Sequence, residues 1–248
     1  MKKLPKEVTK LIDNYFNLNV NGKKVKAPYH INVKHIRAGL RSLVGKGTPE
    51  EIEEEVNIFA KLRSFNLKKA SDNDIRQFMQ KEGIGVDCSG LVAHILDTWL
   101  KSEKMGDLKS NVTFPKLSFF KRMVIKLRPI ENIGANLLTN NENSTPIELE
   151  NVQVGDLIRL KGIEKGHHIA IITDVNEKEI EYVHSTKHYG QNNGIKKGKI
   201  KILDKKKDLE HQNWLEKDEK GVCWTLKQYL KEKDDNGLRR PKFFVKNQ

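Results

Sequence analysis

The spacing of apolar residues changes once along this 248-residue chain, and that change restricts the fold more than any other feature. Residues 1–82 carry apolar residues at helical intervals, which predicts a mainly helical beginning. After about residue 153 the periodicity shortens, and short runs separated by turn-like residues are typical of strands. These strand-like runs are VGDLIRL (154–160), HHIAIITDV (167–175), EIEYVHST (179–186) and GKIKIL (198–203). Helices followed by an antiparallel meander predict an α+β fold.

Three helix starts are marked by residues that can cap a first turn. Thr48 precedes Pro49 and a run of glutamates, Ser71 precedes DNDIRQFM, and Asp87 precedes Cys88. Their side-chain oxygens can accept the backbone N–H groups that a first helical turn leaves free. We therefore expect helices to begin at these three positions.

The other segments are less regular. Residues 103–150 are mixed, and TNNENSTP (139–146) within them predicts an exposed loop. Near the C-terminus, residues 224–233 predict a helix and residues 238–245 predict a last strand.

The composition excludes some classes of protein. The formal net charge of +13 favours contact with an anionic polymer, although a solvated, lysine-rich surface explains it equally well. There is no zinc-finger spacing, RNA-binding aromatic motif or basic heptad repeat, so no specific nucleic-acid partner is expected. No run of eighteen apolar residues occurs, so no membrane span is expected.

The N-terminal sequence and the cysteine content bear on location. The segment MKKLPKEVTKLIDNYF is basic but has no uninterrupted apolar stretch, unlike a secretory signal peptide. Two cysteines, Cys88 and Cys223, make no disulfide framework and suit a reducing compartment. We expect a cytoplasmic protein, with non-classical export to the cell wall as the alternative.

Cys88 occupies an informative position in the segment GIGVDCSGLVAHIL (83–96). If Asp87 is the N-cap, Cys88, Ile95 and Trp99 share one helix face at 100° per residue. The thiol then lies on the buried face but at the positive end of the helix, which favours a thiolate and a pKa below the usual value of about 8.5. A small core residue at a helix start is the alternative interpretation.

A base for such a thiol is available on the predicted strands. Alternation places His168 and Ala170 on one face of their strand and His167 on the other. The small Ala170 leaves room for a helix end beside His168, which makes His168 the candidate base. His184 lies on the next strand, from which it can reach the His168 ring and fix its orientation. This combination favours thiol chemistry over a structural role for each residue alone.

Other candidates have simpler explanations. His167 and His168 point to opposite faces, so they cannot readily bind one ion together with His184, and we expect no metal and no cofactor. Cys223 has no neighbouring histidine and is expected to be a packing residue. His94 is placed off the buried face of its helix and is expected to be exposed.

Four segments, in this order, resemble the NlpC family of papain-like cysteine peptidases: DCSGLV (87–92), VGDLI (154–158), HHIAII (167–172) and YVHS (182–185). The resemblance implies a papain-like α+β fold, with N-terminal helices packed on an antiparallel sheet or barrel of five or six strands. It also implies that Cys88 is the nucleophile, His168 the base and His184 the orienting residue. The backbone N–H of Cys88 would form part of an oxyanion site.

The resemblance also implies three substrate-binding residues. In members that cut peptidoglycan stem peptides, an acid and a hydroxyl beside the cysteine bind the free amino end of the peptide, and Asp87 and Ser89 match them here. A role as a plain N-cap accounts for Asp87 at this position equally well. A Pro-Tyr pair usually precedes the cysteine closely, but the only candidate is Tyr29 in APYHI, far upstream.

The same resemblance implies a division of the chain. Residues 1–74 would form a helical N-terminal region, either separate from or integral to the catalytic domain, and residues 75–248 would form the hydrolase domain. Residues 102–150 would be an insertion near the active site. Its run FPKLSFFKRMVIKL (114–127) suits a lid over an anionic or amphipathic ligand, or a helix packed on the domain.

These observations favour a cysteine hydrolase that cleaves an amide bond through an acyl-enzyme. The favoured substrate is a peptide or peptidoglycan fragment, cut by a stem-peptide endopeptidase. Two alternatives are an amidase or acyl transferase with a non-peptidoglycan substrate, and a cationic binding module without turnover.

Overall fold

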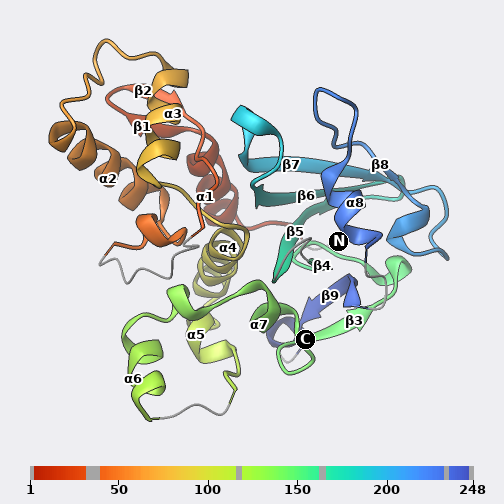
Figure 1. The fold of residues 1–248 in the computed structure, drawn as a ribbon. Helices are drawn as coiled ribbons and strands as arrows, with labels where there is room; N and C mark the ends of the chain where they lie inside the picture. The colour runs from red at the N-terminus through yellow and green to blue at the C-terminus, as the bar shows by residue number, and fades with distance from the viewer. Residues whose placement is uncertain (1–2, 32–39, 116–118, 162–165, 232–234, 246–248) are drawn as a thin grey trace.

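The computed structural model describes residues 3–31, 40–115, 119–161, 166–231 and 235–245. It combines a helical part with a curled antiparallel sheet, so the predicted α+β class is confirmed (Figure 1). Within the described ranges this sheet has seven strands, in the order β3-β9-β4-β5-β6-β7-β8. The described sheet therefore has one strand more than the upper end of the expected range of about five or six.

The predicted helix starts at Thr48, Ser71 and Asp87 are all confirmed, because each residue caps its helix with its side chain. The α-helices are α1 (Lys6–Phe16), α2 (Pro49–Leu62), α3 (Asp72–Glu82), α4 (Cys88–Ser102), α5 (Leu108–Asn111), α6 (Phe119–Leu127), α7 (Ala135–Thr139), α8 (Trp224–Tyr229) and α9 (Lys242–Val245). Short 3-10 turns are η1 (Ser42–Val44), η2 (Ile130–Asn132), η3 (Leu149–Asn151), η4 (Gly190–Asn192) and η5 (Leu209–His211).

The main sheet contains β3 (Ser144–Ile147), β4 (Leu157–Lys161), β5 (His167–Val175), β6 (Glu179–Thr186), β7 (Gly194–Lys201), β8 (Asn213–Trp214) and β9 (Gly237–Pro241). A separate hairpin of β1 (Leu18–Val20) and β2 (Lys23–Val25) interrupts the helical first part. Strand β3 begins inside the predicted exposed loop 139–146, where it pairs with β9. The predicted last strand is too long, because β9 ends at Pro241 and α9 follows.

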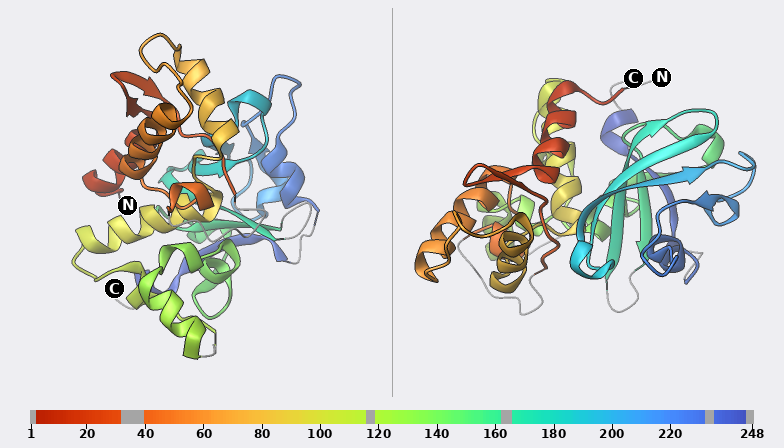
Figure 2. Two further views of the ribbon diagram at one scale, coloured as in Figure 1. Left: turned by 60° about the vertical axis from the view of Figure 1, so that its left-hand side comes forward. Right: turned by 90° about the horizontal axis from the view of Figure 1, so that it is seen from above.

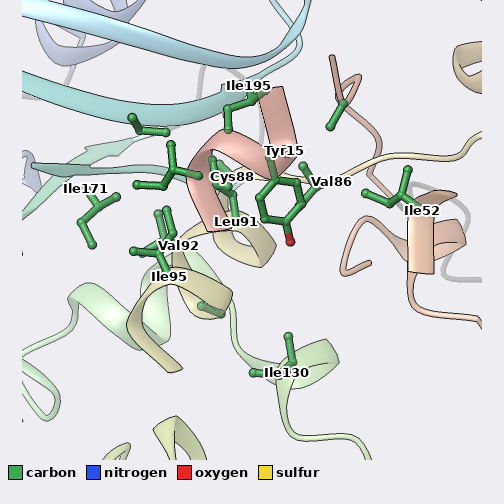
Figure 3. Packing of buried hydrophobic residues seen from close by; sticks show 14 of the residues in the cluster. Tyr15, Ile52, Val86, Cys88, Leu91, Val92, Ile95, Ile130, Ile171 and Ile195 are labelled. Atoms are coloured by element: carbon green, nitrogen blue, oxygen red, sulfur yellow. The ribbon is translucent and has the colours of Figure 1, made fainter. Parts of the chain in front are cut away.

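Helix α4 lies between the N-terminal helices and the sheet (Figure 2). Its apolar residues form one core with α1, α2 and α3 on one side and with β5, β6 and β7 on the other. Figure 3 shows Cys88, Leu91 and Ile95 of α4 in this core, near Ile171 and Ile195 of the sheet. A second core fills the inside of the curled sheet, around Tyr182 and Trp214.

Residues 1–74 take part in the first of these cores. Val8, Tyr15 and Leu18 are fully buried there, and the Tyr15 hydroxyl donates a hydrogen bond to the Gly47 carbonyl at 2.8 Å. No helix in the described part of the chain is long and apolar enough to cross a membrane.

Candidate active site

The start of α4 is built as the sequence predicts. Asp87 has an extended backbone, and its Oδ1 accepts the Gly90 N–H at 2.6 Å. Cys88 is therefore the first helical residue, and it is buried, with 7% of the residue exposed. Cys88, Ile95 and Trp99 are all buried, so the predicted face of α4 does point into the core.

The start of α4 lies where β5 and β6 separate. The first paired residues of the two strands are Ile171 and Val183, although β5 begins at His167 and β6 continues to Thr186. At the open end, Ser185 Oγ donates a hydrogen bond to the Val86 carbonyl at 2.6 Å.

The other strand end contacts the thiol itself. The backbone of Ile169 is hydrogen-bonded to the Cys88 sulfur. The donating nitrogen is only two covalent bonds from the Cα of His168. The structure thus brings Cys88 to the backbone of the predicted base.

The predicted strand parity is correct, but the side facing the helix is not the expected one. Ile169 and Ile171 pack in the core that contains α4, whereas Ala170 lies in the core inside the sheet. Ala170 therefore does not mark the side that α4 approaches. His168 shares its strand face with Ala170, and among the described residues its ring is hydrogen-bonded to His184 and not to the Cys88 thiol. In unliganded enzymes such catalytic contacts are often long and tighten on substrate binding.

His168 belongs to a buried chain of three ionisable side chains. His168 Nε2 lies 2.8 Å from His184 Nδ1, and His184 Nε2 lies 2.9 Å from Glu216 Oε1. Glu216 stands between β8 and α8. Its second oxygen accepts hydrogen bonds from the Tyr182 hydroxyl at 2.6 Å and the Thr225 hydroxyl at 2.9 Å. The expected contact between His168 and His184 is present, and Glu216 was not predicted.

Glu216 determines the protonation pattern of this chain. Burial would raise the pKa of Glu216, but His184 and the hydroxyl donors outweigh burial and bring the pKa to about 2. The carboxylate only accepts hydrogen bonds, so the proton of neutral His184 lies on Nε2. His184 Nδ1 then accepts from His168 Nε2–H. The lone pair of His168 is therefore on Nδ1, which is free to take a proton.

Cys88 and His168 both rest in their neutral forms. Burial raises the pKa of the Cys88 thiol to about 12, and the Asp87 charge adds to this. Lys46 and the backbone of Ile169 and Ser89 act in the opposite direction but do not prevail. The expectation of a lowered pKa from the helix start alone is therefore wrong. Burial, followed by the neighbouring His184 imidazole, holds the pKa of His168 well below its usual value.

Asp87 and Ser89 flank the thiol as the resemblance implies, but both bind a side chain of the protein itself. Lys46 Nζ donates to Asp87 Oδ1 at 3.0 Å and to Ser89 Oγ at 2.5 Å. Ser89 Oγ also donates to Asp87 Oδ1 at 2.9 Å. His94 is buried, against expectation, because its Nε2 is hydrogen-bonded to the Lys46 carbonyl at 2.8 Å.

Tyr29, although far upstream in sequence, lies near the thiol. Burial raises its pKa first, and the nearby charges of Cys88 and Asp87 raise it further. Its segment is fixed on both sides, because the Pro28 carbonyl accepts the Val86 N–H at 3.1 Å and the Tyr29 N–H donates to Asn193 Oδ1 at 3.2 Å. The role of Tyr29 in a substrate cleft stays a prediction.

The remaining candidates lie apart from this chain. His167 Nε2 is hydrogen-bonded to Asp235 Oδ2 at 3.0 Å and to Arg159 Nη2 at 2.8 Å, which ties it to a buried arginine on the other face of β5. Cys223 is a free thiol whose sulfur accepts the Leu226 N–H at the start of α8.

One group in the described part of the chain has the composition of a metal site. Asp208, Glu210 and His211 have ligand atoms within 4.8 Å of one another, but Asp208 and His211 are exposed. Exposed acidic clusters are common without an ion. This trio is separate from the histidines considered above.

The segment 102–150 contains α5, α6, η2, α7 and β3 (Figure 1). It reaches the site through the carbonyl of Ile133, which accepts a hydrogen bond from Lys46 Nζ at 3.2 Å. The prediction of a lid at 114–127 falls partly on residues 116–118 and on the side chains of residues 119–122, which lie outside the description.

Comparison with known proteins adds no further constraint, because neither a protein-family model nor a curated protein matches this chain. The geometry of Cys88, His168, His184 and Glu216 therefore carries the functional argument.

Proposed function

We propose that this protein is a cysteine hydrolase that cleaves an amide bond through an acyl-enzyme. The observation that carries the proposal is the buried chain from Glu216 through His184 to His168, which meets a helix-start cysteine at the separated ends of β5 and β6. The resemblance of the four short segments to NlpC-type peptidases supports Cys88 as nucleophile, His168 as base and His184 as the orienting residue.

The chemistry starts from a neutral thiol and a neutral imidazole. Cys88 Sγ attacks the amide carbonyl carbon while its proton passes to His168 Nδ1. The Glu216 carboxylate, acting through His184, favours the imidazolium that forms. The C–N bond then breaks, His168 returns the proton to the leaving nitrogen, and a thioester remains on Cys88. Water deprotonated by His168 cleaves the thioester and regenerates the thiol.

The helix start supplies a hydrogen-bond donor for the oxyanion that develops on the substrate. The first N–H groups of an α-helix have no partner within the helix, and the Asp87 side chain caps only that of Gly90. The Cys88 N–H is therefore suited to stabilise negative charge on the carbonyl oxygen of the substrate.

Peptides, including peptidoglycan stem peptides, are the first substrate class for this site. An amidase or acyl transferase with a different acyl donor is the second candidate. It is favoured by Lys46, which already binds the two side chains that would hold the amino end of a stem peptide.

The test is hydrolysis of defined muropeptides and N-acylated peptide amides, with products identified by mass. We expect cleavage by the wild type and none by Cys88→Ala. His168→Ala should lose about 10²- to 10⁴-fold in turnover. His167→Ala is the matched control, because its side chain lies on the opposite strand face, and it should keep most of its activity. Cleavage that survives in Cys88→Ala would contradict the proposal.

A further inference from the structure

Lys46 places an ammonium group directly beside the candidate nucleophile. Its Nζ donates to Asp87 Oδ1 at 3.0 Å, to Ser89 Oγ at 2.5 Å and to the Ile133 carbonyl at 3.2 Å. An ammonium has three N–H donors, so each of them has an acceptor. The ion pair is almost dry, since the side chains of Lys46 and Asp87 are only 7% and 8% exposed.

The position of this ammonium is also fixed by contacts that the backbone of Gly45 and Lys46 makes. The Gly45 carbonyl accepts the Asp87 N–H at 2.8 Å, and the Lys46 carbonyl is hydrogen-bonded to the His94 ring. Lys46 also pairs with Val86 in an isolated antiparallel bridge. The backbone of Val86 and Asp87, before Cys88, and the His94 ring, after it, therefore hold the backbone of Lys46 in place and direct its Nζ to these acceptors.

We infer that Lys46 fills an ammonium-binding position beside Cys88, so that the site takes an acyl group without a free amino group at this position. A substrate ammonium would meet a like charge there and would have to displace a buried ion pair, which is costly to break. The acyl donor is then an N-acylated or internal amide. The statement about substrate rests on the proposed function, whereas the statement about Lys46 does not.

Chemical rescue tests the filled position without any enzymatic activity. Lys46→Ala removes the atoms of n-propylammonium from the side chain, which leaves space and acceptors for that ion. We expect the Tm of Lys46→Ala to fall and then to rise with n-propylammonium chloride, as for any ligand that binds only the folded state. Tetramethylammonium chloride at equal ionic strength is the control, because it has no N–H to donate.

Lys46→Met and the wild type are the controls that show whether the rescue is specific to the empty position in Lys46→Ala. Lys46→Met fills the same space without a charge, so neither it nor the wild type should gain Tm selectively from n-propylammonium. If Lys46→Ala does not fold alone, it should refold in the presence of n-propylammonium and not of tetramethylammonium. Equal effects of the two salts on Lys46→Ala, or the same rescue of Lys46→Met, would overturn the inference.

A substrate pair tests the consequence for specificity. The wild type should hydrolyse the N-acetylated form of a peptide at a higher kcat/KM than the form with a free amino end, because the free ammonium would lie against Lys46. A preference of about tenfold or more for the free amine, which is what one hydrogen bond to a charged group supplies, would contradict the inference. If neither peptide is cleaved, the proposed function fails, while the Tm experiment still decides the role of Lys46.

Discussion

At the scale of single residues, Glu216 determines which nitrogen of His168 is free to act. The carboxylate accepts from His184 Nε2, and the alternation of donors and acceptors that follows leaves the lone pair on His168 Nδ1. Glu216 touches no reacting atom in this account. It is a positioning residue that acts through His184 and that favours positive charge on His168.

Glu216→Gln tests this positioning role. The amide oxygen can still accept from His184, but the negative charge that raises the pKa of His168 is lost. We expect kcat to fall by about tenfold or more, but by less than the roughly 10²- to 10⁴-fold that the loss of a positioned base causes, with KM little changed. The acid limb of the rate profile should move to lower pH.

Tyr182→Phe is the control for Glu216→Gln. It removes one donor to Glu216 and leaves the contact of Glu216 with His184 intact. Its effect on kcat should be much smaller. A Glu216→Gln variant with the kcat and the pH profile of the wild type would show that the carboxylate only stabilises the fold.

The lowered pKa of His168 predicts the pH dependence of activity. The base acts only when neutral, and burial lets it stay neutral below its usual titration range near 6.5. As pH falls, kcat/KM should therefore hold through pH 6.5 and decline only at lower values. The measurement is a kcat/KM profile, which reports groups of the free enzyme. An acid limb with its midpoint at or above pH 6.5 would contradict the assignment.

The same residues show how far the sequence could predict the site. Asp87, Cys88, His168 and His184 each stand in a short pattern with a local meaning, namely a cap, a helix start or an alternating strand. Glu216 is one of 33 acidic residues and lies outside any periodic segment. Its role depends on contacts with side chains from β6 and α8, which no local pattern encodes.

At the scale of elements, the start of α4 is fixed by how closely the preceding backbone approaches it. A Cβ on Gly90 would lie 2.4 Å from the Gly45 carbonyl oxygen and 3.0 Å from Lys46 Cδ. The absence of a side chain at Gly90 thus lets the segment before α2 pass close to the start of α4 and place Lys46 beside Asp87 and Ser89.

Gly90→Ala tests this close approach. Helix propensity alone favours alanine inside a helix by about 1 kcal/mol. The clash with the Gly45 backbone should outweigh it, so we expect a loss of about 1–3 kcal/mol in the free energy of unfolding, measured with urea. Gly134→Ala is the control, since its Cβ would meet open space, and it should change stability by less than about 0.5 kcal/mol. A Gly90→Ala variant as stable as the wild type would contradict this account.

Elements with several turns or long strand-like runs were predictable, and short elements were not. Helices α2, α3 and α4 carry a capping residue and a long apolar stripe, and β4 to β7 are runs of five to nine residues with turn-like residues between them. Strands β3 and β8 are too short for such a run and form because a partner strand is available. The hairpin β1–β2 does carry a local signal, since Asn21 and Gly22 both have positive φ, but the helical interpretation of residues 1–82 passed over it.

At the scale of the whole molecule, α4 joins the helical part and the sheet through one continuous core. Trp99 lies in this core and Trp214 in the core inside the sheet. We expect a single cooperative unfolding transition, with helical circular dichroism and tryptophan fluorescence changing at the same urea concentration. Two separate transitions would show that residues 1–74 fold independently of the sheet.

The central claim is that Cys88 is a nucleophile activated by His168, and covalent trapping tests it most directly. The protein is incubated with p-nitrophenyl acetate, quenched in acid and mapped by mass spectrometry. We predict an acetyl group on Cys88 in the wild type and in Cys223→Ala. The adduct should form about 10²- to 10⁴-fold more slowly in His168→Ala. Acetylation of Cys223 instead, or equal rates in the wild type and His168→Ala, would contradict the claim.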